Sequence, residues 1–353
     1  MINQSSAVGR NVQVTGAGIA GVVSCLPERR ISNAHFEAQF GEAAVKDVVK
    51  MIGVENRYWT DENTSTRDLC AKAGQHLLSN LNWLPETVDA LIFVSQTPDF
   101  RLPATACALQ ADLGLSSACI AFDINLGCSG YPYALWLGMT MVQTGAAQRV
   151  LLAVGDTISK IVDPTDRSTA LLFGDAGTVT AIESATGQTA VFVLGTDGSG
   201  VSNLIVPKGA FKDYSQVNDP RLSGKAADCL FMDGGEIFNF TLRAVPALVS
   251  ETIKRSGVSL EKYDAFLFHQ ANLFMLKHLI KKSKLPFEKT PINIDQFGNT
   301  SCASIPLLLT SSLKERLREE SMKLAMFGFG VGYSWAGVSL NVGPLKCVEI
   351  IKC

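Results

Sequence analysis

The sequence predicts an α/β protein built from two duplicated halves, each with a parallel-dominated sheet. Apolar segments typical of buried strands alternate along the chain with longer segments that have helical spacing. The motif DALIF at Asp89 recurs as DAFLF at Asp264, an offset of 175 residues that is close to half the chain length. We therefore expect an N-terminal half over 1–185 and a C-terminal half over 186–353.

Two further pairs of similar segments support the duplication. FDINLGCS, Phe122 to Ser129, is matched by NIDQFGNTS, Asn293 to Ser301, and RVLLAVGD at 149–156 is matched by KLAMFGFG at 323–330. Open α/β sheets present functional groups at the carboxyl ends of their strands. Two similar halves that face each other about an approximate two-fold axis would bring such groups from both halves to one place.

Composition limits the classes of function. The 353 residues are 47% apolar and 18% charged with a formal charge of -2, which is typical of a globular protein and argues against a nucleic-acid partner or a polybasic membrane anchor. Nine scattered cysteines lack the short spacings of metal ligands and form no evident disulfide framework, so we expect no metal. The chain shows no signal pattern and no long apolar run, which favours a cytoplasmic protein with no membrane segment.

The first strand is expected over Asn11 to Leu26. It contains GAGIAG, Gly16 to Gly21, which has the spacing of a dinucleotide-binding fingerprint. Such a site needs a helix that starts at the glycines, and Pro27 would cut that helix short. We therefore expect a glycine-rich bend within a strand.

The remaining elements of the first half follow in order. Two helices come first, followed by a buried strand and a further helix. A strand buried on both faces, a helix and two more strands complete this half, and polar segments separate the elements. The polar loop DPTDRST joins the last two strands. These elements are expected at 35–53, 66–81, 89–97, 104–114, 119–124, 131–141, 149–156 and 176–183.

Cys128 lies in the expected turn from strand to helix and is a candidate nucleophile. Gly127 and Gly130 allow a tight turn and close approach to the sulfur, while the N-terminus of the following helix favours a thiolate. The alternative is a buried structural cysteine, because free cysteines are among the most buried residues.

His269 and Asn299 are candidates to join it. His269 directly follows the apolar strand DAFLF, and Asn299 lies in the segment that echoes the Cys128 turn. Each also has a structural interpretation, since His269 could be a hydrogen-bonded core residue and Asn299 could cap a helix. Their placement at related strand ends favours one shared site.

With these residues in hand, the sequence resembles the thiolase-fold condensing enzymes, specifically the beta-ketoacyl-ACP synthase III (FabH-like) family. The resemblance spans most of the chain and is carried by six blocks in the family's order. These are NLGCSGYPYAL around Cys128, DPTDRSTALLFGDAGT at 163–178, MDGGEIF at 232–238, HQAN at 269–272, FGNTSCASIP at 297–306 and GFGVGYSW at 328–335.

This resemblance implies a five-layered α-β-α-β-α fold, a homodimer and a catalytic triad of Cys128, His269 and Asn299. Cys128 would take an acyl group from a thioester, with the backbone amides of Cys128 and Val331 as the oxyanion hole. His269 and Asn299 would then stabilise the enolate formed as malonyl-ACP loses carbon dioxide, and that carbanion would attack the acyl-cysteine. The expected partners are acyl carrier protein and the acyl thioester, with no cofactor.

The sequence departs from the family at the expected substrate contacts. Arg167 matches an arginine that holds the adenine of coenzyme A, but Asp47 stands where its tryptophan partner is usual, and Phe274 replaces the arginine that follows HQAN-Leu. These departures favour a specialised paralogue that uses an ACP-bound starter over an enzyme that takes its starter from coenzyme A.

Other contacts follow from the same resemblance. Leu102 occupies the position of a phenylalanine that closes the neighbouring subunit's acyl pocket, so a smaller residue would admit starters longer than acetyl. A basic run after HQAN matches the family's carrier-protein docking surface, although a solvated helix face gives the same pattern. It consists of Lys277, Lys281, Lys282 and Lys284.

Three alternatives remain open. Related enzymes pass the acyl group to an oxygen or nitrogen acceptor instead of a carbanion. The same three side chains also serve thioester hydrolases, in which water is the attacking group. The third alternative is a non-catalytic subunit that supports a partner synthase. The complete triad argues against this alternative.

Overall fold

The structure, a computed structural model, describes residues 8–214 and 219–353. Within these ranges, nine strands form one large sheet, and two pairs of short strands lie outside it. The large sheet contains β1 (Arg10–Leu26), β4 (Ala90–Val94), β5 (Ile120–Ile124), β6 (Arg149–Asp156), β7 (Ala176–Thr196), β10 (Ala265–Phe268), β11 (Met322–Gly330), β12 (Ser334–Val342) and β13 (Cys347–Lys352). The short pairs are β2 (Arg30–Ser32) with β3 (Asn56–Tyr58), and β8 (Leu204–Ile205) with β9 (Phe231–Met232).

The long strands β1 and β7 join two sections of the sheet. The first part of β7 pairs with β6 and its last part with β12, while β1 pairs with both parts. One section therefore runs β5-β4-β6-β7-β1-β13 and the other β10-β11-β12-β7-β1. Residue 185, the expected boundary between the halves, lies within β7.

The sheet is mixed, so the prediction of parallel-dominated sheets is wrong. Strand β4 runs parallel to β5 and β6, β10 to β11, and β1 to β13, but β7 is antiparallel to β1, β6 and β12, and β11 is antiparallel to β12. Only 331–333 separate β11 from β12. A connection this short allows an antiparallel hairpin and no crossover.

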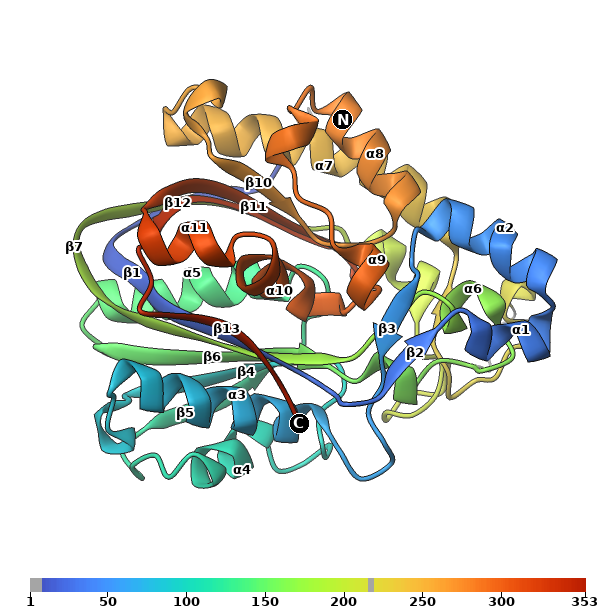
Figure 1. Cartoon of the computed structure of the whole chain (residues 1–353), viewed down its shortest axis with the longest axis horizontal. Coiled ribbons are helices and arrows are strands. Elements are labelled where there is room, and N and C mark those ends of the chain that lie inside the picture. The colour runs from blue at the N-terminus through green and yellow to red at the C-terminus, as the bar shows by residue number, and fades with distance from the viewer. Residues whose placement is uncertain (1–7, 215–218) are drawn as a thin grey trace.

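Helices cover both sections and fill the space between them, which gives five layers (Figure 1). α3 and α4 cover the outside of the first section, α5 and α10 lie between the sections, and α7 and α8 cover the outside of the second. Their bounds are α3 (Thr66–Leu81), α4 (Thr105–Asp112), α5 (Gly130–Gln143), α7 (Gly234–Ser256), α8 (Leu273–Lys282) and α10 (Ser304–Ser311). The remaining helices are α1 (Ala34–Phe40), α2 (Glu42–Ile52), α6 (Arg167–Ala170), α9 (Ile294–Phe297) and α11 (Lys314–Glu319). The α/β fold with five layers is confirmed.

Strand β4 shows why these sequences form layers. All five of its residues are buried, and they alternate between two hydrophobic cores. Ile92 and Val94 face the central core with α5 and α10, whereas Leu91 and Phe93 face the outer core with α3 and α4. Because side chains alternate along a strand, a strand covered by helices on both faces is apolar throughout.

Strand β5, which leads to Cys128, does not follow this pattern. It lies at the edge of the sheet beside β4, and its burial runs from exposed at Ile120 to intermediate at the other four positions. The prediction of a strand buried on both faces is therefore wrong. An apolar sequence by itself does not distinguish a central strand from an edge strand.

Local boundaries differ from the predictions at several points. The helix expected over 35–53 is divided into α1 and α2 at Gly41, whose φ of 81° does not fit a helix. The segment before Asn299 forms the short helix α9 where its counterpart in the first half forms β5, so Asn299 does not follow a strand. Within DPTDRST, residues from Arg167 onward begin α6.

The glycine-rich motif lies wholly within β1, as predicted, and no helix starts there. Register shifts between Thr15 and Ala17, and between Ile19 and Gly21, give the expected bend. A side chain at Gly21 would lie 2.9 Å from the Leu77 side chain of α3. Helix packing therefore accounts for this glycine.

No helix in the described ranges is both long and apolar enough to cross a membrane.

Candidate active site

Cys128 lies in the turn between β5 and α5, as predicted. A side chain at position 127 in place of Gly127 would contact Gln96 and lie 2.7 Å from the Val331 side chain. A side chain on Gly330, at the end of β11, would lie 2.9 Å from Cβ and 3.0 Å from Sγ of Cys128. Glycines from both halves therefore let the chain pack closely around this sulfur.

His269 follows β10 and is 2% exposed. Its Nδ1 lies 2.8 Å from Oγ of Ser304, at the start of α10, and its backbone N–H donates to the carbonyl of Phe327. Burial lowers the pKa of His269 from 6.5 to about 3, and a hydrogen bond with the Ser301 backbone opposes this shift only partly. The imidazole is therefore neutral at physiological pH.

Asn299 is held through both its backbone and its side chain. Its backbone N–H donates to the carbonyl of Leu172 over 2.9 Å, and its Oδ1 accepts from the backbone N–H of Ser301 at 2.9 Å. This second bond fixes the turn that follows. Thr300 and Ala303 are the N-cap residues of the helical segments after it, and neither segment has a side-chain cap, so the interpretation of Asn299 as a helix cap is wrong. Its Nδ2 donates to the carbonyl of Ala271 at 3.3 Å, which is long for a hydrogen bond.

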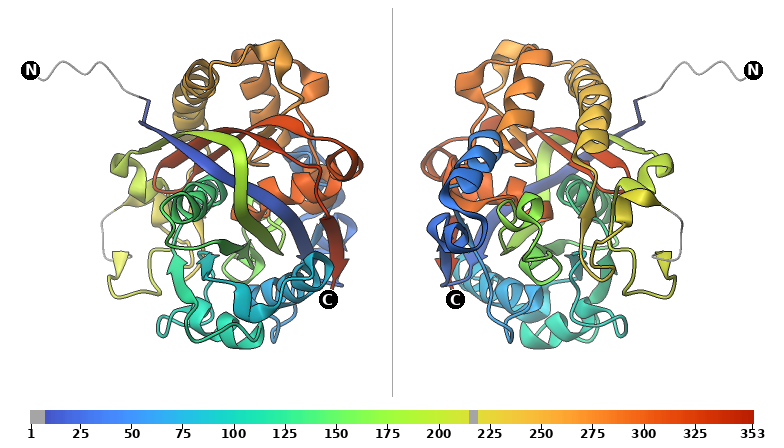
Figure 2. Two further views of the ribbon diagram at one scale, coloured as in Figure 1. Left: turned by 90° about the vertical axis from the view of Figure 1, so that its left-hand side faces the viewer. Right: turned by 90° about the vertical axis from the view of Figure 1, so that its right-hand side faces the viewer.

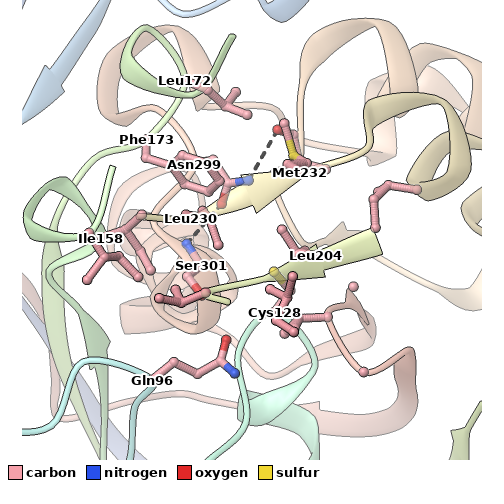
Figure 3. Close-up of a pocket in the computed structure, with 18 of the residues that line it drawn as sticks. Gln96, Cys128, Ile158, Leu172, Phe173, Leu204, Leu230, Met232, Asn299 and Ser301 are labelled. Carbon is pink, nitrogen blue, oxygen red and sulfur yellow. Dashed lines mark hydrogen bonds between the residues drawn. The ribbon is translucent and has the colours of Figure 1, made fainter. Parts of the chain in front are cut away.

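These three side chains line one cavity of about 570 Å³. Figure 3 shows Cys128 and Asn299 among the side chains around it. Cys128 comes from the first half of the chain, and His269 and Asn299 from the second. The rest of the lining is largely apolar and includes Ile158, Leu172, Phe173, Leu204, Leu230, Met232 and Phe329. A volume of this size with a few convergent polar groups is typical of a site for a small apolar ligand.

The sulfur of Cys128 is surrounded by hydrogen-bond donors. The backbone N–H groups of Val331 and of Cys128 itself donate to it, and the Ser301 side chain makes a further hydrogen bond. Burial, together with the negative charge of Asp156, nevertheless raises the pKa of this thiol to about 12. Burial of the sulfur therefore opposes the thiolate, which the N-terminus of α5 is predicted to favour.

The residues expected to select the substrate lie elsewhere. Leu102 is 78% exposed and Phe274 is 43% exposed. Arg167 is exposed on α6, while Asp47 pairs with Lys50 on α2 at 3.2 Å. Of the described residues that line the cavity, none belongs to this set.

The basic run extends from α8 into the turn that follows it. Lys277, Lys281, Lys282 and Lys284 are all exposed. Lys282 donates to the carbonyl of Leu242 over 2.8 Å. Since Met275 near the start of α8 lines the cavity, this charged surface begins close to the site.

Sequence reasoning missed Asp156, Ser301 and Ser304. Ser301 and Ser304 lie in FGNTSCAS, which was recognised only for Asn299, and Asp156 ends a strand that was predicted correctly. A buried acid after an apolar strand was the available signal for Asp156. Its contact with the Cys128 site depends on packing between distant segments.

Two family models match the chain. One is described as 3-Oxoacyl-[acyl-carrier-protein (ACP)] synthase III and covers residues 122–198. The other describes the C-terminal part of the same synthase and covers residues 253–342. Together these matches contain all three cavity residues described above.

Named relatives agree with the family models. The chain is 34% identical to the beta-ketoacyl-ACP synthase III of Caldanaerobacter subterraneus, over 91% of this chain and 96% of the relative. It is also 34% identical to the beta-ketoacyl-ACP synthase III of Lactococcus lactis, over 93% of this chain and 100% of the relative. A crystal structure of a 3-oxoacyl-ACP synthase from Burkholderia xenovorans matches with a TM-score of 0.97 and 63% identity, covering 98% of this chain and 100% of that one. The resemblance found in the sequence is thus confirmed, and the chain belongs to the 3-oxoacyl-[acyl-carrier-protein] synthase III family.

Proposed function

We propose that the protein is an acyltransferase that condenses an acyl starter with malonyl-ACP to give a beta-ketoacyl-ACP. The observation that carries the proposal is the convergence of Cys128, His269 and Asn299 on one apolar cavity. Cys128 attacks the starter thioester and becomes acylated. The N–H groups of Cys128 and Val331, which both point at the sulfur, then stabilise the oxyanion of the tetrahedral intermediate.

His269 and Asn299 act in the second half-reaction. In the tautomer that carries its ring proton on Nε2, neutral His269 accepts from Ser304 through Nδ1 and can donate the Nε2 proton to the malonyl thioester carbonyl. Asn299 supplies a second donor through Nδ2. Because its hydrogen bond to the Ala271 carbonyl is long, this group can exchange that bond for one to the substrate. These donors stabilise the enolate that forms as carbon dioxide leaves, and the enolate carbon attacks the acyl group on Cys128.

The identity of the products tests this proposal against its two enzymatic alternatives. Incubation with an acyl thioester and malonyl-ACP is expected to release carbon dioxide and yield a beta-ketoacyl-ACP. Release of free acid without carbon dioxide would indicate a hydrolase. Acyl esters or amides, formed only when an alcohol or amine is added, would indicate transfer to an oxygen or nitrogen acceptor.

We also propose that acyl carrier protein delivers the starter and that the enzyme is a specialised paralogue. Support comes from Asp47, which pairs with Lys50 where an aromatic partner for adenine is expected, and from Phe274, which packs on Phe238 with ring centroids 5.5 Å apart. Arg167 remains exposed for a contact with coenzyme A. Parallel acylation assays with acyl-CoA and acyl-ACP donors of one chain length distinguish the carriers.

A homodimer completes the proposed pocket. Strand β5 is an edge strand, and Leu102 projects from a nearby loop with 78% of its surface exposed, as a residue that enters a neighbouring subunit would. Because leucine is smaller than phenylalanine, starters longer than acetyl are expected to acylate Cys128. A strict preference for acetyl across a chain-length series would contradict this role of Leu102.

The proposed setting is the cytoplasm, where thiols stay reduced. All nine cysteines lie in described residues and are unpaired, and the reaction needs Cys128 as a free thiol. No cofactor is included in the proposal because thiol, imidazole, amide and backbone N–H groups supply the chemistry. The substrates are the acyl thioester and malonyl-ACP.

A further inference from the structure

Two carboxamide side chains line the cavity without a part in the proposed reaction. Gln96 lies two residues beyond the end of β4 at Val94, and Asn125 directly follows β5. Strands β4 and β5 are parallel neighbours, so their carboxyl ends meet at one edge of the sheet. Open sheets present functional groups at this edge, and both carboxamides can donate as well as accept hydrogen bonds.

Gln96 is held beside the turn that carries the nucleophile. Its backbone N–H donates to Oδ1 of the buried Asp156 at 2.7 Å, which fixes the base of the side chain. Its Oε1 lies against Gly127, the residue before Cys128, and a side chain at position 127 would collide with it. The glycine therefore leaves room for this carboxamide next to the acylated residue.

The hydrogen-bonding capacity of the two carboxamides is largely unused. Nε2 of Gln96 donates to Oδ1 of Asn125 at 3.4 Å, a distance at which a hydrogen bond is weak. Within residues 8–214 and 219–353, neither carboxamide forms another side-chain hydrogen bond. An apolar ligand packed on Gln96 would displace its water without replacing the lost hydrogen bonds, which costs free energy. A ligand with a polar atom at this point would avoid that cost.

The proposed reaction directs the acyl chain toward Gln96. His269 and Asn299 bind the malonyl carbonyl, so the malonyl unit approaches Cys128 from their side of the cavity. In Figure 3, Asn299 lies above Cys128 and Gln96 lies below it. The chain of an acyl group attached to Cys128 therefore leaves the malonyl side free when it extends toward Gln96.

We propose that Gln96, supported by Asn125, selects starters whose acyl chain carries a neutral hydrogen-bonding oxygen, a hydroxyl or keto group. The carboxamides are uncharged and match such an oxygen as donor or acceptor. In the described part of the chain, the charged residues that line the cavity are Lys208 and Asp228, which are opposite in sign. A carboxylate on the starter would therefore meet no net positive charge.

This inference rests on the proposed function and names the substrate class of the same site. Donors of one chain length test it, namely the hexanoyl, 3-hydroxyhexanoyl, 4-oxohexanoyl and 5-oxohexanoyl thioesters of N-acetylcysteamine. Each is given to the parent and to Gln96→Met, and the mass added at Cys128 is followed over time. Methionine is unbranched like glutamine but has no side-chain donor, and it keeps the backbone hydrogen bond to Asp156.

For the parent, we expect at least one oxygen-bearing donor to acylate Cys128 about fivefold faster than hexanoyl, the effect of one net hydrogen bond. In Gln96→Met, this rate ratio should fall to that of the free thiol N-acetylcysteine, which measures the intrinsic reactivity of each thioester. Should Gln96→Met fail to fold, the ratios of the parent relative to those of N-acetylcysteine decide the outcome.

Gln75→Met on α3 is the matched control. This carboxamide is exposed, donates to the carbonyl of Asp112 at 3.3 Å and lies outside the described lining of the cavity. The variant should keep the rate ratios of the parent.

A parent whose ratios equal those of N-acetylcysteine or favour hexanoyl would overturn the inference. So would a preference for oxygen-bearing donors that survives in Gln96→Met. Failure of every donor to acylate Cys128 in the parent would instead contradict the proposed function, so the two failures are distinguishable.

Discussion

At the scale of single residues, the site depends on close packing around one sulfur and on a buried neutral imidazole. The sequence identified Cys128 as a candidate because Gly127 and Gly130, which allow the tight turn, lie beside it in the chain. It did not reveal Ser301, which lies 173 residues later in the chain and lines the same cavity, or the buried Asp156, 28 residues later, whose charge raises the pKa of the thiol. Contacts of this kind arise from tertiary packing and leave no local pattern.

Gly330→Ala is expected to impair Cys128, both through contact of the added methyl group with Cys128 and through a φ of 158° that other residues rarely adopt. The added methyl group would lie 2.9 Å from Cβ and 3.0 Å from Sγ of Cys128, so the sulfur must move from its position. We expect at least a 100-fold lower rate of acylation, measured by intact mass, since small displacements of reacting groups have effects of this size. Gly198→Ala, with no atom within 4 Å of the added methyl, should leave the rate unchanged. Equal rates in the two variants would show that the sulfur tolerates the contact.

The buried His269 predicts a pH dependence of stability. The folded-state pKa, about 3, lies below the ordinary value of 6.5, so between these values the unfolded chain binds a proton that the folded chain does not. The stabilisation associated with neutral His269 is therefore present above pH 6.5 and is lost as the pH falls toward 3. The loss is about 1.4 kcal/mol per pH unit at most.

Urea unfolding of the parent and His269→Gln at pH 7 and pH 5 measures this effect. Relative to the variant, the parent should lose about 2 kcal/mol of unfolding free energy on going to pH 5. His278→Gln, at an exposed position on α8, serves as the control. If the difference in unfolding free energy between the parent and His269→Gln is the same at pH 7 and pH 5, the assignment of a buried neutral histidine is contradicted.

At the scale of elements, α8 connects the cavity to the proposed docking surface. Its first turn contributes Met275 to the cavity, and its last turn carries exposed lysines. The sequence predicted both the lysines and the preceding strand, because charge and hydropathy are local properties. It did not predict that β5 lies at an edge or that α9 replaces a strand, since these depend on which neighbours each segment meets.

Reversing charge on α8 should weaken carrier binding without affecting the chemistry. For Lys277→Glu with Lys281→Glu, we expect the KM for malonyl-ACP to rise at least fivefold while kcat changes less than twofold. Carrier proteins are acidic, and opposite charges across an interface mainly govern association. Lys254→Glu, near the end of α7, is the control. A fall in kcat with unchanged KM would argue against a docking role.

At the scale of the whole molecule, the arrangement of two sheet sections accounts for how distant residues meet. The two sections lie on either side of α5 and α10, and the long strands β1 and β7 join them (Figures 1 and 2). The repeat was visible in the sequence because equivalent strands keep similar apolar residues. The mixed strand directions were not, because they depend on how β7 and β12 pair.

The edge strand β5 predicts how the molecule associates. Ile120→Lys places a charge on this edge, where Ile120 is 46% exposed, and should shift a dimer toward monomer in sedimentation velocity. Leu84→Lys alters a different exposed apolar residue, 60% accessible and outside β5, and should leave the assembly unchanged. A parent that sediments at 37.9 kDa would exclude the dimer altogether.

The most direct test of the account separates the two half-reactions. The parent, Cys128→Ala, His269→Ala and Asn299→Ala are each given an acyl thioester and then malonyl-ACP, and the mass added at Cys128 and the carbon dioxide released are both measured. We predict that His269→Ala and Asn299→Ala still become acylated but release carbon dioxide at least 100-fold more slowly, whereas Cys128→Ala forms no adduct. Acylation of Cys128→Ala at the parent level, or parent-like carbon dioxide release from His269→Ala and Asn299→Ala, would contradict the shared active site.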